Sequence, residues 1–190
     1  MSNTNPRWPT RRVLASLLLA AFGVAALAGS ALAASLVKNG SFEKDSNGDG
    51  IPNNWLGNFN FTPADKRVCN QSHAGTCSFR LVGDGNNKFF SQELAISGID
   101  GDQYDLSAWV KTKAINFGAG SARGYVLFNH TGGGTNEVFF GISSLTSPWA
   151  FYKLFEVEAA ADYNSITIFM QSSITSGKWW VDQVKLVPSP

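Results

Sequence analysis

The stretch YDLSAWVK, from Tyr104 to Lys111, decides the fold more directly than any other part of the sequence. Its side chains fall into two alternating sets, Tyr104, Leu106, Ala108 and Val110 in one and Asp105, Ser107, Trp109 and Lys111 in the other. Successive side chains of a β-strand point to opposite faces of its sheet. The alternation therefore predicts a strand with its first set buried, and the turn at residues 100–102 begins it.

Runs with the same period recur from Trp55 to the end of the chain, bounded by Gly, Asn or Asp, and no sustained helical period interrupts them. The expected strands cover residues 55–61, 77–82, 90–96, 104–111, 123–130, 138–142, 151–157, 166–171 and 178–187. Short strands separated by turns predict an all-β domain, a two-sheet antiparallel β-sandwich of the jelly-roll kind.

Residues 1–33 have the features of a signal peptide. Three arginines without an acid precede an apolar run, and Ala31, Leu32 and Ala33 form a small-residue cleavage signal. Cleavage after Ala33 leaves one domain, residues 34–190. A membrane anchor is the alternative, which the many Ala and Gly residues disfavour. Arg11 and Arg12 leave ordinary and twin-arginine export open. We therefore expect a secreted, periplasmic or extracellular protein with no membrane attachment after cleavage.

The charge of the exported part excludes one class of partner. Of 15 basic side chains, three lie in residues 1–33, which leaves 12 against 14 acidic ones. Nucleic acid is not an expected partner, because phosphate binding requires a basic face. Low charge with many aromatic residues is typical of an extracellular β-domain that meets neutral ligands.

Both cysteines, Cys69 and Cys77, lie in the exported part, eight positions apart. An oxidising compartment favours a disulfide within a hairpin. The alternative is a metal site that adds His73, but it lacks a fourth ligand nearby.

The stretch NGSFEKDSNGDGIPNNW, residues 39–55, suggests a cation site. Asp45, Asn47 and Asp49 alternate with small residues, as oxygen ligands of a hard cation usually do. The twelfth position of an EF-hand loop would require Glu and is Leu56 here, which rejects a complete EF-hand. A calcium loop that borrows ligands from elsewhere and a plain Asx-rich turn both remain open.

Several motifs, in order, resemble one family. They are Asn39 to Glu43, Gly75 before the strand at 77–81, Tyr104 to Lys111, Trp149, and Trp180 to Leu186. The chain resembles carbohydrate-binding modules of the cellulose- and xylan-binding type, which have the galactose-binding-like jelly roll, over residues 35–187. The resemblance implies a non-catalytic protein whose partner is an oligosaccharide or polysaccharide.

The resemblance also implies a structural calcium ion, Ca²⁺, bound by Glu43, by Asp182 and by backbone carbonyls of the first strand. The sequence agrees, since both acids lie among apolar strand residues, where a carboxylate is costly without a cation. Asp45, Asn47 and Asp49 are optional further ligands. The alternative is that each acid only caps a turn.

Sugar sites combine aromatic rings with hydrogen-bonding side chains. The residues that we expect to line one concave sheet are Arg123, Tyr125, Asn129, Phe169, Gln171 and Trp179. Trp55 and the loop at 131–136 are candidates for a second site at the edge. We expect packing roles for Trp109, Trp149 and Trp180.

An enzyme is the alternative class, because Glu137, Glu156, Glu158 and Asp162 are carboxylates of the kind that glycoside hydrolysis needs. Nothing in their spacing singles out a pair, so we expect no catalysis. A calcium-stabilised adhesion or matrix protein is a third reading. The sequence does not specify the sugar or the oligomeric state.

Overall fold

The structure is a computed structural model that describes residues 34–190, and within that range it contains ten β-strands and no helix. The strands are β1 (Leu56–Gly57), β2 (Lys66–Val68), β3 (Ser78–Val82), β4 (Lys88–Leu94), β5 (Gln103–Asn116), β6 (Ala122–His130), β7 (Thr135–Gly141), β8 (Ser147–Glu158), β9 (Tyr163–Ser172) and β10 (Ser176–Pro188). The predicted signal peptide lies outside the described residues. Among residues 34–190 no helix is long and apolar enough to cross a membrane.

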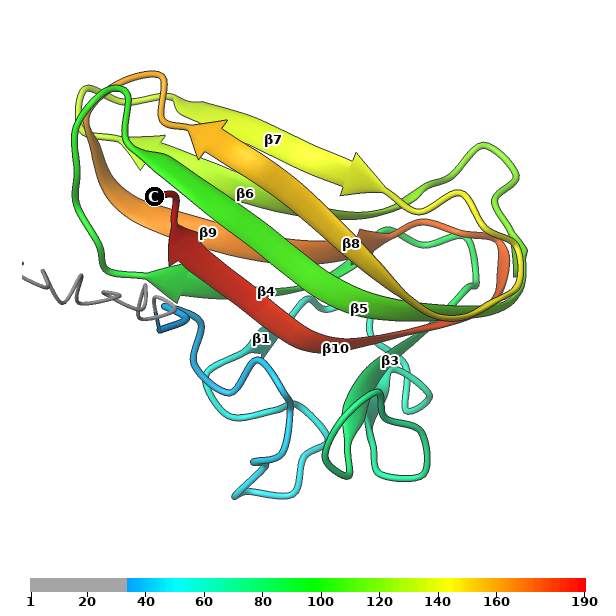
Figure 1. Ribbon diagram of the computed structural model, residues 1–190. Helices are drawn as coiled ribbons and strands as arrows, with labels where there is room; N and C mark the ends of the chain where they lie inside the picture. The colour runs from blue at the N-terminus through cyan, green and yellow to red at the C-terminus, as the bar shows by residue number, and fades with distance from the viewer. Residues whose placement is uncertain (1–33) are drawn as a thin grey trace, which may run out of the picture. The chain divides into compact units, whose positions relative to one another are not determined.

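The strands form two five-stranded antiparallel sheets that face each other (Figure 1). Sheet A has the order β1-β4-β9-β6-β7, and sheet B has the order β2-β3-β10-β5-β8. The predicted all-β sandwich is therefore confirmed. Sheet A is the sheet that carries the candidate site.

The core lies between the sheets and consists of the inward positions of the alternating strands. Of the predicted inward set of β5, Leu106, Ala108 and Val110 are at most 1% exposed. Phe42, Trp55 and further aromatic residues pack together at one end, with ring centroids of Phe42 and Trp55 5.4 Å apart. A side chain of this size contributes about 1.5–3 kcal/mol when fully buried, so this core is the main source of stability.

The disulfide between Cys69 and Cys77 closes a loop against sheet B. The bond confirms the predicted pairing, and it excludes the alternative in which both thiols bind a metal. Within the loop, Gly75 has a φ of +70°, and a Cβ atom there would lie 2.3 Å from Glu43 Oε1. Glycine is favoured at this position because of the positive φ, and any other residue would also displace the carboxylate of Glu43.

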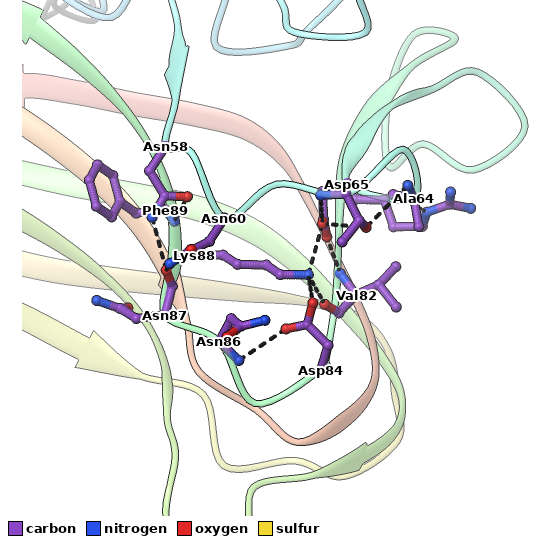
Figure 2. Close-up of polar contacts among 12 residues, drawn as sticks. Asn58, Asn60, Ala64, Asp65, Val82, Asp84, Asn86, Asn87, Lys88 and Phe89 are labelled. Carbon is purple, nitrogen blue, oxygen red and sulfur yellow. Dashed lines mark hydrogen bonds and ion pairs between the residues drawn. The ribbon is translucent and has the colours of Figure 1, made fainter.

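A buried lysine anchors the start of β4 (Figure 2). Lys88 is 1% exposed, and its Nζ lies 2.8 Å from Asp65 Oδ2 and 2.7 Å from Asp84 Oδ2. The same Nζ donates a hydrogen bond to the Val82 carbonyl. Lysine is almost never fully buried unless it is paired. The triad of Lys88, Asp65 and Asp84 therefore compensates the buried charge, and it holds the turn between β3 and β4 because Asp84 lies in that turn.

The neighbours of Lys88 connect this anchor to sheet A. The backbone carbonyl of Asn87 accepts hydrogen bonds from the amides of Asn58 and Asn60, and the amide nitrogen of Phe89 donates to Asn58 (Figure 2). Phe89, which follows Lys88, points to the opposite face. The triad therefore sets the position of an outward-facing aromatic ring.

Candidate functional site

The outer face of sheet A carries a row of aromatic rings, which we call the aromatic strip: Phe89, Phe169, Tyr125 and Phe139. Tyr125 on β6 pairs with Phe169 on β9 and with Phe139 on β7, so the strip crosses the strands nearly at right angles. The rings of Tyr125 and Phe169 stack with centroids 4.7 Å apart and planes 8° apart. Phe89 meets Phe169 edge to face at 5.4 Å.

The rings differ in how much surface they offer. Phe139 is 53% exposed, Phe89 and Phe169 are half-buried, and Tyr125 is only 7% exposed. Burial raises the pKa of the Tyr125 phenol, and the carboxylate of Glu137 adds to the effect. Tyr125 therefore packs the strip together, while the three phenylalanines present ring surface to a ligand.

Arg123 holds a row of polar side chains beside the strip. Its Nε donates to Gln171 Oε1 at 2.7 Å, and its Nη1 donates to Glu137 Oε1 at 2.9 Å. Gln171 in turn donates to the side chain of Asn87 at 2.7 Å. The guanidinium also lies over the rings of Tyr125 and Phe139, 4.9 and 5.3 Å from their centroids. These contacts fix the polar groups before any ligand arrives.

Asn129 lies on the other side of the strip and donates to the hydroxyls of Ser165 and Thr167. Five of the predicted ligand-binding residues therefore share one face: Arg123, Tyr125, Asn129, Phe169 and Gln171. The alternation of β6 and β9 predicts this result, because every one of them occupies an odd position.

A hollow of about 460 Å³ lies at one end of the strip. Arg123 and Phe139 form one wall, and Phe117 and Ile142 contribute apolar surface. Its volume falls in the range of roughly 300–1,000 Å³ that is typical of small-molecule sites. The face thus combines an open aromatic surface with a recess.

The prediction for Trp179 is wrong. The residue is 1% exposed in the core, whereas its neighbour Trp180 lies on the outer side of sheet B with Asp182. The cause is a β-bulge between Asp182 and Lys185, where Gln183 has a φ of +52°. A bulge inserts one residue and reverses the alternation of side chains. After the bulge, Val184 and Leu186 point inward, but before it the inward residues are Trp179 and Val181 instead of Trp180 and Asp182.

The prediction for Trp55 as an edge site is also wrong. Its ring is 3% exposed and packs between Phe42 and Phe90, and its indole donates to the Asn39 carbonyl. Residues 131–134 form an exposed turn between β6 and β7, whereas Trp55 precedes β1 at the other edge of sheet A. No edge site forms from these elements.

Phe89 and Phe139 are functional candidates that sequence reasoning missed. Each precedes a buried phenylalanine, Phe90 or Phe140, in a strand. Alternation alone therefore places them on the outer face, and this signal was available from the sequence.

The two predicted calcium ligands lie on either side of the disulfide loop. Asp182 is fully buried, accepts hydrogen bonds from the amides of His73, Ala74 and Gln183, and has no ion pair with the described residues. Burial raises the pKa of its carboxyl, although these amides act against the rise. The three amides satisfy its oxygens, but no cationic side chain among the described residues offsets its charge, which a bound cation would do.

Glu43 is held by the other end of the loop. Its carboxylate accepts hydrogen bonds from the Thr76 hydroxyl, the Thr76 amide and the Cys77 amide. Burial acts to raise the pKa of Glu43, but these hydrogen bonds outweigh it and hold the pKa below its ordinary value. Arg67 donates to the carbonyls of Phe42 and Glu43, which leaves fewer first-strand oxygens free than the family resemblance implies.

Asp45, Asn47 and Asp49 form an Asx-rich turn. The carboxylate of Asp45 accepts the amides of Gly48 and Gly50, and Asn47 donates to Asp49. In residues 34–190 no three acidic, histidine or cysteine side chains are placed together for a metal. The structure does not join this turn to Glu43 and Asp182, so the two acids would need carbonyl or water oxygens to complete a calcium site.

No protein-family model and no curated protein matches the sequence. The similarities are to solved structures, at 10–18% identity. The enzymatically active domain of bacteriophage CBA120 tailspike protein 4 aligns with a TM-score of 0.62 and 17% identity, over 81% of this chain but 21% of the phage chain. This chain therefore matches about a fifth of that enzyme.

Two carbohydrate-binding modules align over nearly their whole length. TmCBM61, solved with β-1,4-galactotriose, gives a TM-score of 0.55 at 16% identity and covers 83% of this chain and 100% of the module. The CBM22-1 xylan-binding domain of Paenibacillus barcinonensis Xyn10C gives 0.52 at 14% identity, over 82% of this chain and 95% of the domain. The chain therefore has the fold of carbohydrate-binding modules, as the sequence motifs predicted.

Proposed function

We propose that this protein binds a glycan chain across the outer face of sheet A without cleaving it. The observation that carries the proposal is the aromatic strip, flanked by polar side chains already held in position. Pyranose rings have apolar faces that stack on aromatic rings, and their hydroxyls take hydrogen bonds from Arg, Asn and Gln. The shared fold with modules solved on galactotriose and named for xylan binding supports the same ligand class.

Non-catalytic binding is the better reading of the carboxylates near this face. Glu137 lies beside the strip but is paired with Arg123 at 2.9 Å. Glycoside hydrolysis needs two carboxylates across the bond to be cleaved, one of them able to donate a proton. An ion-paired Glu137 does not suit that role. Release of reducing sugar by the purified protein would overturn this part of the proposal.

Replacement of Phe139 or Phe169 by Ala is expected to weaken retention on a bound polysaccharide about tenfold, because each ring loses its stacking contact. Affinity electrophoresis through gels that contain xylan, galactan or β-glucan measures the effect. Phe155→Ala is the matched control, since Phe155 is 69% exposed on β8 of sheet B. Equal retention of all variants would contradict the proposal, and so would the absence of retention by the unmodified protein on any glycan.

We also propose a structural calcium ion between Glu43 and Asp182. Calcium at 100 times its dissociation constant is expected to raise Tm by about 5–10 °C, and EDTA to reverse the rise. Glu43→Gln is expected to abolish the response, and Asp49→Asn, in the Asx-rich turn, to preserve it. Differential scanning calorimetry checks both. A calcium response that survives in Glu43→Gln but disappears in Asp49→Asn would move the ion to the turn, and no response at all would reject it.

The protein is proposed to act outside the cytoplasm, after removal of residues 1–33. The Cys69–Cys77 bond supports an oxidising compartment. N-terminal sequencing of the exported protein is expected to begin at Ala34.

A further inference from the structure

A second recess lies on the opposite side of the molecule, between the disulfide loop at 69–77 and the outer face of sheet B. We call it the disulfide-loop pocket. Its volume is about 170 Å³, below the roughly 300 Å³ of sites for larger ligands. The side chains that define it are His73, Ser107, Trp109, Phe151, Gln183 and Lys185.

One side of the pocket is aromatic. The ring of His73 stacks on Trp109, with centroids 3.6 Å apart and planes 10° apart, and Trp149 meets His73 edge to face at 6.0 Å. Phe151 lies 5.3 Å from Trp109 and is 53% exposed. Phe151 therefore offers a ring face beside a rigid stack, which suits the apolar face of one sugar ring.

Three polar side chains of the pocket have no partner within residues 34–190. Among the described residues, neither the Ser107 hydroxyl, the Gln183 side-chain amide nor Lys185 Nζ makes a hydrogen bond or an ion pair. The disulfide-loop pocket therefore presents free donors, which a ligand satisfies without first breaking internal contacts.

The charge around the pocket is positive. Lys185 has no acidic partner in the described part of the chain, and Lys153 nearby is paired with Asp105 at 2.7 Å. Asp182 lies beneath the loop, but it is fully buried and its oxygens accept backbone amides from both sides. No accessible carboxylate of residues 34–190 lines the pocket. A free ammonium beside an aromatic face favours a ligand that is both a ring and an anion.

We propose that the disulfide-loop pocket binds a single uronic acid residue, with its carboxylate at Lys185 and its ring on Phe151. Ser107 and Gln183, which line the same pocket, would form hydrogen bonds with the ring hydroxyls. The β-bulge between Asp182 and Lys185 lies at the rim of the pocket, and both Gln183 and Lys185 line it. This site is separate from the aromatic strip and does not depend on it.

The test is a backbone-amide NMR titration of the protein with galacturonate and with galactose, its neutral counterpart. Galacturonate is expected to shift the amides of His73, Gln183 and Lys185, and galactose at equal concentration is expected to leave them unchanged. Lys185→Gln is expected to weaken galacturonate binding about tenfold, since a charge-assisted hydrogen bond is lost. Lys178→Gln is the matched control, as Lys178 is exposed on the same strand outside the pocket.

Phe169→Ala separates the two sites, because it damages the aromatic strip and is expected to leave galacturonate binding intact. Equal galacturonate affinity in Lys185→Gln and the unmodified protein would overturn the proposal. Shifts confined to Phe139 and Phe169, or no saturable shift at all, would overturn it as well.

Discussion

Lys88→Met is expected to lower the free energy of unfolding by about 3–5 kcal/mol, the cost of removing one partner from a buried ion pair. Asp65 is the reason for the large effect. Its side chain is fully buried, and without Lys88 its charge would keep only the hydrogen bonds from Thr62 and Val82. Urea unfolding measures the loss.

The control is Lys178→Met, which is expected to change the free energy of unfolding by less than about 0.5 kcal/mol, as for most surface substitutions. A loss of the same size in both variants would contradict a specific role for the triad. Because Lys88 precedes Phe89, folded Lys88→Met is also expected to bind glycan less tightly than the control.

The triad also sets a pH dependence. Burial acts to raise the pKa of Asp84, but hydrogen bonds from Lys88 and Asn86 outweigh it and hold the pKa below its ordinary value. Asp84 therefore stabilises the folded state above the ordinary Asp pKa of about 3.9, and the contribution is lost as the pH falls through the lower folded value. In Lys88→Met, the decrease in the free energy of unfolding on acidification is expected to be smaller, because Asp84 has lost its partner Lys88.

Trp179→Ala is expected to lower the free energy of unfolding by about 3–5 kcal/mol, because it opens a large cavity between the sheets. Trp179 is 1% exposed and belongs to the core. Below the midpoint of its unfolding transition, the folded fraction is expected to retain glycan affinity. The measurement pairs urea unfolding with affinity electrophoresis in the cold.

The opposite pattern, normal stability with lost binding, would place Trp179 in the ligand site and contradict the fold described above. Trp109→Ala is the comparison variant, and it is expected to lower the free energy of unfolding less than Trp179→Ala does, because Trp109 is only partly buried and lines the disulfide-loop pocket.

Strand alternation explains how much the sequence could predict. In β6 and β9 no bulge interrupts the stretch from Arg123 to Asn129 or its partners, so the pattern places Tyr125, Phe169 and Gln171 correctly on one face. In β10 the bulge after Asp182 breaks the pattern, so alternation predicts the wrong side of the sheet for Trp179. The alternation of inward and outward side chains therefore predicts the face of a residue only where no bulge shifts the pairing of the strands.

Long-range pairing explains what the sequence could not predict. Asp65 and Lys88 are 23 positions apart, and His73 and Asp182 are 109 positions apart. No local pattern indicates either pair, because each depends on which strands become neighbours. The disulfide was predictable because its cysteines are close in sequence and the proposed export would place them in an oxidising compartment.

The glycan is proposed to lie on the outer face of sheet A. A titration of the protein with the glycan that it retains best, followed by backbone-amide NMR, tests this claim most directly. We expect saturable shifts at Phe89, Arg123, Phe139 and Phe169, with affinity lowered about tenfold in Phe139→Ala and unchanged in Phe155→Ala. Shifts that avoid these strands and gather on sheet B or on the loops would contradict it.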